Sequence, residues 1–380
     1  MLAVTGAYMF MLSLMLAASQ AAPAPKPAET PDVVVVANRM GAALKRCLER
    51  NCPPEEEVEA AMEAGAESFA AGRYEEAKKT LRLAISRNAK YAKVIPTKIS
   101  DLYATYADVA EHEGDETAFI DSTRNSVTVL RRALGEGHPA AIRVSARIGD
   151  MWAKLGQPQR ADGAYQREAE RAARFGRRDL AGMLSFRRAW LALAARDKPH
   201  ARKLSVQLER EYGREPVFAP ALAILKARLA LGDGKDDGTA AFIAAIRQAG
   251  MADPLLMREP PYPEFDPAPM VFGSSRDIIW ADIGFWIQPD GTTAGIEVLR
   301  PAEDGAWARR LFKQIAGRRY SPVEGAEAGS MGVYRVERYT LRPAYKADIG
   351  TRIRQRVGPV SLHQVDITKL AAHTEGSATP

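Results

Sequence analysis

The strongest constraint on the fold is an alternation along one run of residues that leads into a Pro-Asp-Gly turn sequence and is followed by a second run. Along residues 279–287 one face carries Ile279, Ala281, Ile283, Phe285 and Ile287, and the other face, extended by one residue, carries Trp280, Asp282, Gly284, Trp286 and Gln288. A repeat of two residues is the period of a half-buried β-strand. Pro289 and Gly291 supply the backbone angles of a chain reversal, and a second run follows at 293–300. The sequence therefore predicts an antiparallel β-hairpin.

A helix and a third strand are predicted after the hairpin. Glu303 and Asp304 are acidic residues suited to the positive end of a helix dipole. The apolar residues that follow recur at helical spacing and are Trp307, Leu311, Phe312 and Ile315. Gly317 would end this helix, and residues 331–341, rich in Val, Tyr and Thr, predict a third strand. One helix would then cover a three-stranded antiparallel sheet, whose exposed edge offers unpaired backbone groups to an incoming strand.

The order of these parts over residues 259–343 resembles the TonB carboxy-terminal domain, a module that grips outer-membrane receptors by adding a strand. Tyr262 and Pro263 hold the place of the Tyr-Pro element that precedes the first strand of that family. Tyr320 and Pro322 match the aromatic residue and the proline that follow its helix. Arg318 stands where a tryptophan is expected, a departure that bears on the packing at the helix end.

The resemblance implies a function and a set of contacts. It implies that the domain binds a protein or peptide partner, such as the TonB box of an outer-membrane receptor, along a sheet edge. The residues implied as partner contacts are Tyr262, Pro263, Tyr334, Val336, Arg338 and Tyr339. The alternative is an α+β domain that is buried against its neighbour and has no partner.

A repeated helical pattern fills residues 55–250. Its clearest copy has small and aromatic residues at the spacing of a tetratricopeptide helix pair, namely Ala64, Phe69, Gly72, Tyr74, Ala77, Leu81 and Ala84. Looser copies lie at 100–134, 147–169, 180–208 and 218–249. The array resembles tetratricopeptide repeats, which implies a solenoid whose concave surface binds peptides or protein segments. A solenoid that serves only as a spacer is the alternative.

The expected fold class is therefore α+β. A tetratricopeptide-like helical solenoid at 55–250 precedes a small TonB-like domain at 259–343, made of a three-stranded antiparallel sheet with one helix. Residues 344–380 are expected to form a partly disordered tail.

The amino-terminal residues have the composition of an export signal. Residues 2–19 are apolar or small and uncharged, and Ala18-Ser-Gln-Ala-Ala22 offers the small residues at which a signal peptidase cuts. We therefore expect a signal peptide at 1–21 and a periplasmic protein. The alternative is an uncut anchor in the inner membrane, facing the periplasm, since about 18 apolar residues is the lower limit for spanning a bilayer.

Residues 22–54 are expected to form a linker with a short helix at 38–50. The stretch 32–37, Asp-Val-Val-Val-Val-Ala, resembles a TonB box, and its β-branched residues favour a strand. An ordinary edge strand, or a lead-in to the helix, is the alternative.

The chain has two cysteines, Cys47 and Cys52, which could close a small loop as a disulfide in an oxidising periplasm. Two free thiols are the alternative.

The sequence carries few signs of catalysis. The five histidines are scattered without a helical pair suited to zinc, and neither a nucleophile elbow nor a Gly-rich phosphate loop is present, so neither a metal site nor a cofactor is expected. A formal charge of +6 is too small at this length to indicate a nucleic-acid partner, and none is expected. These features favour a non-enzymatic, periplasmic interaction scaffold. A membrane-anchored energy transducer of the TonB type is the alternative, and membrane association would require that the amino-terminal segment be retained.

Overall fold

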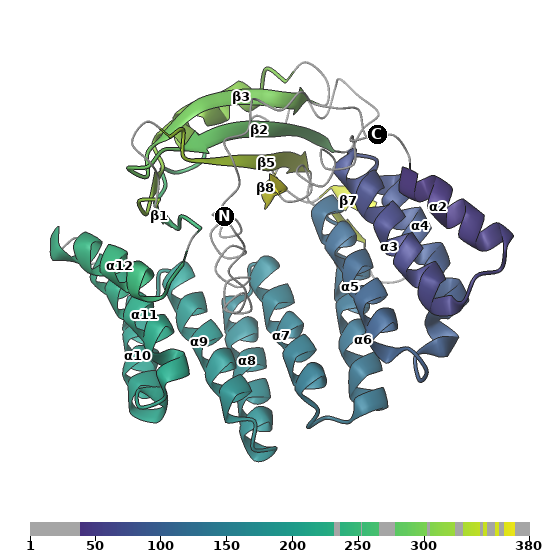
Figure 1. Ribbon diagram of the computed structural model, residues 1–380, viewed down its shortest axis with the longest axis horizontal. Coiled ribbons are helices and arrows are strands. Elements are labelled where there is room, and N and C mark those ends of the chain that lie inside the picture. The colour runs from purple at the N-terminus through teal and green to yellow at the C-terminus, as the bar shows by residue number, and fades with distance from the viewer. Residues whose placement is uncertain are drawn as a thin grey trace.

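The computed structural model shows an α+β protein in which a helical region precedes small antiparallel sheets (Figure 1). It describes residues 39–231, 236–251, 253–265, 278–301, 305–323, 330–342, 345–347, 354–356 and 361–368. The expected signal peptide at 1–21 and the TonB-box-like stretch at 32–37 lie outside the described residues.

Helices α3 to α12, here called the helical array, form a curved fan of paired helices (Figure 1). The short helix α2 (Arg39–Glu49) precedes the array. The helices of the array are α3 (Pro54–Ala70), α4 (Tyr74–Asn88), α5 (Pro96–Glu113), α6 (Glu116–Leu134), α7 (Pro139–Lys154), α8 (Pro158–Arg174), α9 (Arg178–Ala194), α10 (Lys198–Tyr212), α11 (Ala219–Leu231) and α12 (Asp236–Gln248). Two 3₁₀ turns, η1 (Ala89–Tyr91) and η2 (Pro216–Phe218), lie between helices of the array. Each predicted repeat copy falls on one helix pair, so the prediction that these residues are helical is confirmed.

Small residues allow the helices of a pair to approach closely. In the first pair, Ala77, Leu81 and Ala84 have no exposed surface and belong to one core cluster. Gly72 links α3 to α4 with a φ of +74°, a left-handed conformation that glycine adopts without the strain of a side chain. Gly156 has the same role between α7 and α8, with a φ of +69°. The glycines of the repeat pattern therefore mark the turns between paired helices.

The strands are β1 (Leu256–Arg258), β2 (Ile279–Ile287), β3 (Thr293–Pro301), β4 (Arg319–Tyr320), β5 (Val333–Arg342), β6 (Tyr345–Ala347), β7 (Arg354–Arg356) and β8 (Ser361–Asp366). The main sheet has the order β3-β2-β5-β8, and all its neighbouring strands are antiparallel. Strands β1 and β4 form one small sheet, and β6 and β7 form another.

The predicted hairpin is confirmed, with β2 and β3 as its strands. Gly291 has a φ of +81°, and its N–H donates to Gln288 O at 2.8 Å, which closes the turn. The predicted helix is shorter than expected and consists of the 3₁₀ turn η3 (Ala308–Leu311) followed by α14 (Phe312–Ala316). Leu311 and Ile315 are fully buried against the sheet, as predicted.

The prediction of three strands is wrong, because β8 adds a fourth strand beside β5. This strand comes from residues 344–380, which were expected to form a partly disordered tail. Ile367, directly after the strand, is only 1% exposed, so this part of the tail belongs to the packed core of the domain.

The main sheet and the small β1-β4 sheet lie across the fan of helices, and together they contact both of its ends (Figure 1). At one end, Arg338 of β5 donates to backbone carbonyl oxygens of α3. At the other end, Arg228 of α11 donates to Met257 O of β1 at 2.6 Å, and Leu255 packs among residues of α11 and α12. The helical array and the sheet therefore form a closed arrangement rather than two separate modules.

Candidate functional site

The two faces of the main sheet have different neighbours. Odd-numbered residues of β2 face the core beneath η3 and α14, where Ile283 and Phe285 have no exposed surface. Even-numbered residues face the helical array, and Asp282 is also fully buried there. The predicted phase of the strand is confirmed. The prediction of a half-buried strand is wrong at Asp282, because Arg338 and the end of α3 cover the second face.

Arg338 of β5 joins the sheet to the end of helix α3. Its guanidinium donates to Asp282 Oδ1 at 2.6 Å and to Oδ2 at 2.9 Å. The same group donates to the carbonyl oxygens of Phe69 and Ala70, each at 2.6 Å. The last carbonyl groups of a helix lack partners one turn ahead and form the negative end of its dipole, so a cation is favoured there. Trp280 lies against the guanidinium, with its ring centroid 4.0 Å from Cζ.

A second set of contacts joins β5 and β8 to the end of helix α5. Arg342 donates to the carbonyl oxygens of Glu111 and His112, the latter at 2.8 Å. Thr340 Oγ1 lies 2.9 Å from His112 Nε2. On β8, His363 Nε2 lies 2.9 Å from Glu111 Oε1. Two helix ends of the array are thus held by two arginines that lie four residues apart on one strand.

The histidines at this contact are buried and uncharged. Burial lowers the pKa of His112 well below its usual value, and the neighbouring His363 adds to the effect. Burial also lowers the pKa of His363, although Glu111 opposes it. For the Glu111 carboxyl, burial alone would raise the pKa, but His363, Lys154 and Arg342 outweigh it, so the pKa lies well below its usual value. The Nε2–H group of a neutral His363 therefore donates a hydrogen bond to Oε1 of an ionised Glu111.

On the other face of the sheet, Arg318 fills the position of the expected tryptophan with a buried ion pair. Its Nη1 donates to Glu337 Oε2 at 2.8 Å, and its Nη2 donates to Tyr339 OH at 2.8 Å. The hydroxyl groups of Tyr320 and Tyr262 each lie 3.3 Å from the guanidinium. Arg318 has no exposed surface. The end of the helix is packed by a paired charge instead of an indole ring, because polar groups from three segments converge on the guanidinium nitrogens.

Strand β8 covers the outer edge of β5, the strand that carries most of the expected partner contacts. The pairing runs from Glu337↔Asp366 to Arg342↔Ser361. Beyond the ladder, Ile367 N–H donates to Val336 O at 2.9 Å. An extended segment of the chain itself therefore occupies this edge.

The residues expected as partner contacts differ in exposure. Val336, Arg338 and Tyr339 are buried, whereas Tyr262, Pro263 and Tyr334 are half-buried. Arg338 and Tyr339 have no exposed surface, because the array covers one and the core of the domain encloses the other. Their side chains are therefore not available to a partner in this structure. Tyr334 packs against Trp286, with ring centroids 4.9 Å apart.

Strand β8 and the residues that hold it are not predictable from local sequence pattern. The run Ser361–Asp366 has no strict alternation of apolar and polar residues, so its period does not indicate a strand. The Gly358-Pro359 dipeptide just before it is the local signal that a new element begins. Glu111 and His112 carry no signal at all, because they stand within an ordinary helical pattern.

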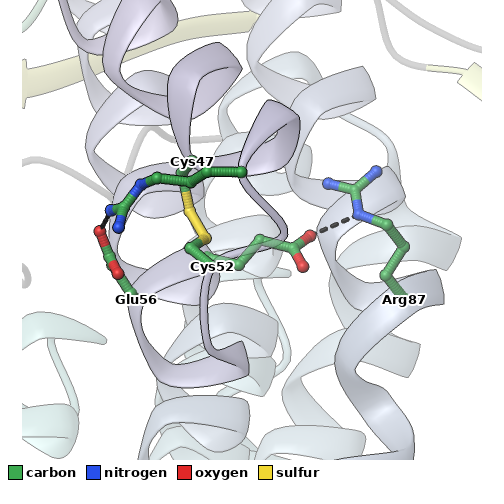
Figure 2. The surroundings of a disulfide bond; sticks show 6 residues. Cys47, Cys52, Glu56 and Arg87 are labelled. Carbon is green, nitrogen blue, oxygen red and sulfur yellow. Dashed lines mark hydrogen bonds and ion pairs between the residues drawn. A yellow bond between two sulfur atoms is a disulfide. The ribbon is translucent and has the colours of Figure 1, made fainter.

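Cys47 and Cys52 are joined by a disulfide at the end of α2 (Figure 2). Their Cα atoms are 5.1 Å apart, and Cys52 N–H donates to Cys47 O at 3.0 Å. Asn51 between them has a φ of +51°, which turns the chain back toward the helix. Beside the disulfide, Arg87 of α4 pairs with Glu57 of α3. The disulfide holds the turn that leads from α2 into α3, and the ion pair joins α3 to α4 at the start of the array.

The described residues contain no group of three or more His, Cys, Asp or Glu side chains arranged to hold a metal ion. Within the same ranges, no helix has both the length and the apolar character needed to cross a bilayer.

Neither a known family model nor a curated protein matches the chain. The outer edge of β5, together with the array that holds it, is the candidate functional site.

Proposed function

We propose that this protein is a non-enzymatic interaction scaffold of the periplasm, in which a tetratricopeptide-like array carries a TonB-like sheet that binds an extended segment of a protein partner. The supporting observation is β8. Six consecutive residues of an extended segment pair with the outer edge of β5 in an unbroken antiparallel register. An edge that accepts a segment of its own chain has the backbone geometry to accept one from a partner.

The partner segment would take the place of β8. Backbone groups of even-numbered β5 residues point toward this edge, because Val336 O accepts from Ile367 N–H and the bonding pattern alternates along an antiparallel ladder. Hydrogen bonds to the main chain provide affinity with little demand on sequence. The opposite edge, on β3, is less suitable, since two register shifts interrupt its pairing with β2. Such bulges protect an edge from strand addition.

The helical array supplies a rigid support for this edge. Arg338 and Arg342 attach β5 to the ends of α3 and α5, and Arg228 of α11 contacts β1 at the far end of the array. A binding edge that is held at several points loses less conformational freedom when a partner pairs with it.

Peptide binding to the full-length protein tests the proposal. The variant Val365→Pro removes a backbone donor from β8 opposite Arg338 and should weaken its hold on β5. Val365→Ala keeps the donor and is the matched control. A fluorescent peptide of residues 359–369 should bind Val365→Pro at least tenfold more tightly than the control, as measured by anisotropy. Circular dichroism should show equal helix content for the two variants. Failure of the peptide to bind either protein would refute strand exchange at this edge.

A further inference from the structure

We infer that the β5 edge selects a partner segment with one pattern of side chains. The pattern is an apolar residue, a hydrogen-bond acceptor two positions later, a carboxylate two positions after that, and then an apolar residue followed by a hydroxyl. The inference rests on the proposed function, and it derives from the contacts that the side chains of β8 and the two residues after it make.

Alternate residues of β8 face the core of the domain. Leu362 packs against the core cluster, and Asp366 pairs with Arg335, so even-numbered residues share this face. His363, on the opposite face, contacts Glu111 of the array. A segment that replaces β8 in the same register must therefore place three of its side chains into the domain.

The first of these positions is apolar. Leu362 packs against the core cluster that contains Tyr339 and stands opposite Leu341 in the ladder. Leu341 is 3% exposed and Tyr339 is fully buried. A polar side chain here would lose its water without gaining a partner from either of these neighbours.

The second position requires an acceptor. Nη2 of Arg318 can only donate, so the Tyr262 hydroxyl 3.3 Å away accepts from it. Burial raises the pKa of Tyr262, so the hydroxyl keeps its own proton and must donate it elsewhere. Gln364 Oε1 accepts the hydrogen bond that the Tyr262 hydroxyl donates. An amide oxygen satisfies this arrangement, whereas a lysine or arginine would oppose donor to donor.

The third position requires a carboxylate. Arg335 Nη1 donates to Asp366 Oδ2 at 2.6 Å, and the Arg335 side chain is only 8% exposed. The other oxygen, Oδ1, accepts from Thr368 N–H at 2.9 Å. A basic residue here would face the Arg335 guanidinium at close range, which would exclude such segments.

The two residues after the carboxylate complete the pattern. Ile367 is 1% exposed and donates its N–H to Val336 O. Thr368 Oγ1 accepts from Val336 N–H at 3.0 Å, so the hydroxyl continues the ladder for one more bond after the strand has turned. Both features belong to the end of the bound segment.

A peptide panel measured against the full-length Val365→Pro protein tests the pattern. The starting probe is the peptide of residues 359–369, and its single changes are Leu362→Ala, Gln364→Lys and Asp366→Lys. Each should weaken binding roughly tenfold or more, because each leaves a buried group of the domain unpaired or a cavity unfilled. Ser361→Ala in the same peptide is the control, since Ser361 is exposed, and it should change the affinity less than about twofold.

A charge exchange gives a second, independent readout. Arg335→Glu in the protein should lose affinity for the starting peptide and regain it for the Asp366→Lys peptide. If all peptides bind with one affinity, the pattern is wrong and strand pairing without side-chain selection remains. If no peptide binds at all, the proposed function fails as well. Because the peptide changes leave the protein unaltered, misfolding of the Arg335 variant would not affect the panel.

Discussion

Arg338 Nε lies 2.6 Å from Asp282 Oδ1, and neither side chain has any exposed surface. The pair lies where the main sheet meets the end of helix α3, and the remaining donors of Arg338 bond to helix carbonyls. Removing two charges from water is costly, so such a pair contributes less to stability than to the choice of one docking geometry. We expect this ion pair to determine how the sheet sits on the array.

Replacing one member of the pair should therefore be costly. Arg338→Met leaves Asp282 as a buried charge with less compensation, and we expect a loss of about 3–5 kcal/mol in the free energy of unfolding. Arg300→Met is the control, because Arg300 also pairs with Asp282, at 2.7 Å, but is 27% exposed. Its cost should be smaller, because Arg338 still pairs with Asp282 in this variant. Urea unfolding measures both, and equal losses would contradict the assigned role of Arg338.

A cavity in the core of the sheet domain should lower the free energy of unfolding by about as much as loss of the buried ion pair. Leu311, the last residue of η3, is fully buried against β2, so Leu311→Ala should lower the free energy of unfolding by about 2–5 kcal/mol. Asp282 on the opposite face is not a tolerant site, because it is buried as well. The matched control is Leu83→Ala on α4, whose side chain is 44% exposed. A tolerant Leu311 would mean that the helix packs on the sheet in a different phase.

Gly72 allows a test of the contact between sheet and array. A Cβ added there would lie 2.2 Å from Trp280 Cζ2, whereas nothing lies within 4 Å of one added at Gly156. Both glycines are left-handed, so alanine should cost about 1–2 kcal/mol of backbone strain at either position. Gly72→Ala should cost more, and combining it with Trp280→Ala should remove the excess. Thermal unfolding of the variants compares these costs, and equal losses at Gly72 and Gly156 would show that Trp280 does not pack on this turn.

The contact at α5 should weaken in acid. The pKa values of His112 and His363 are lowered from 6.5, so below about pH 6.5 the unfolded chain binds protons that the folded chain does not. The free energy of unfolding should then fall as the pH decreases, and Glu111, whose pKa is lowered from 4.5, adds a further loss below about pH 4.5. Each unit of pKa difference contributes about 1.4 kcal/mol.

Urea unfolding at pH 7.5 and pH 5.5 measures this dependence. The double variant His112→Gln, His363→Asn should flatten it, because neither replacement titrates in this range. A slope that survives in the double variant would assign the acid sensitivity to other groups.

Local pattern determines the hairpin and the strand phase. The alternation from Ile279 to Ile287 and the turn at Gly291 depend on neighbours in sequence, and the structure has both as expected. The glycines between paired helices, such as Gly72 and Gly156, are also predictable from their neighbours in sequence. These elements are predictable because backbone preference and burial favour the same conformation at each residue.

The remaining features depend on contacts that no local pattern records. Arg338 lies 269 residues from its acceptor Phe69, and a polar side chain on a strand looks the same in sequence whether it faces water or a helix end. Arg318 is a departure from the expected tryptophan, yet Glu337 and Tyr339 satisfy it from another strand. The burial of polar side chains on β5 results from the packing of the sheet against the array, so neither part alone predicts it.

The position of β8 in the chain has a consequence for biosynthesis. Residues 361–366 leave the ribosome after every other described strand, so β2, β3 and β5 are complete while the outer edge of β5 has no strand beside it. During this interval the nascent chain presents an unpaired template to any extended polypeptide nearby. Interrupted translation or clipping before Ser361 would make that temporary state permanent, and such fragments would tend to associate through β5.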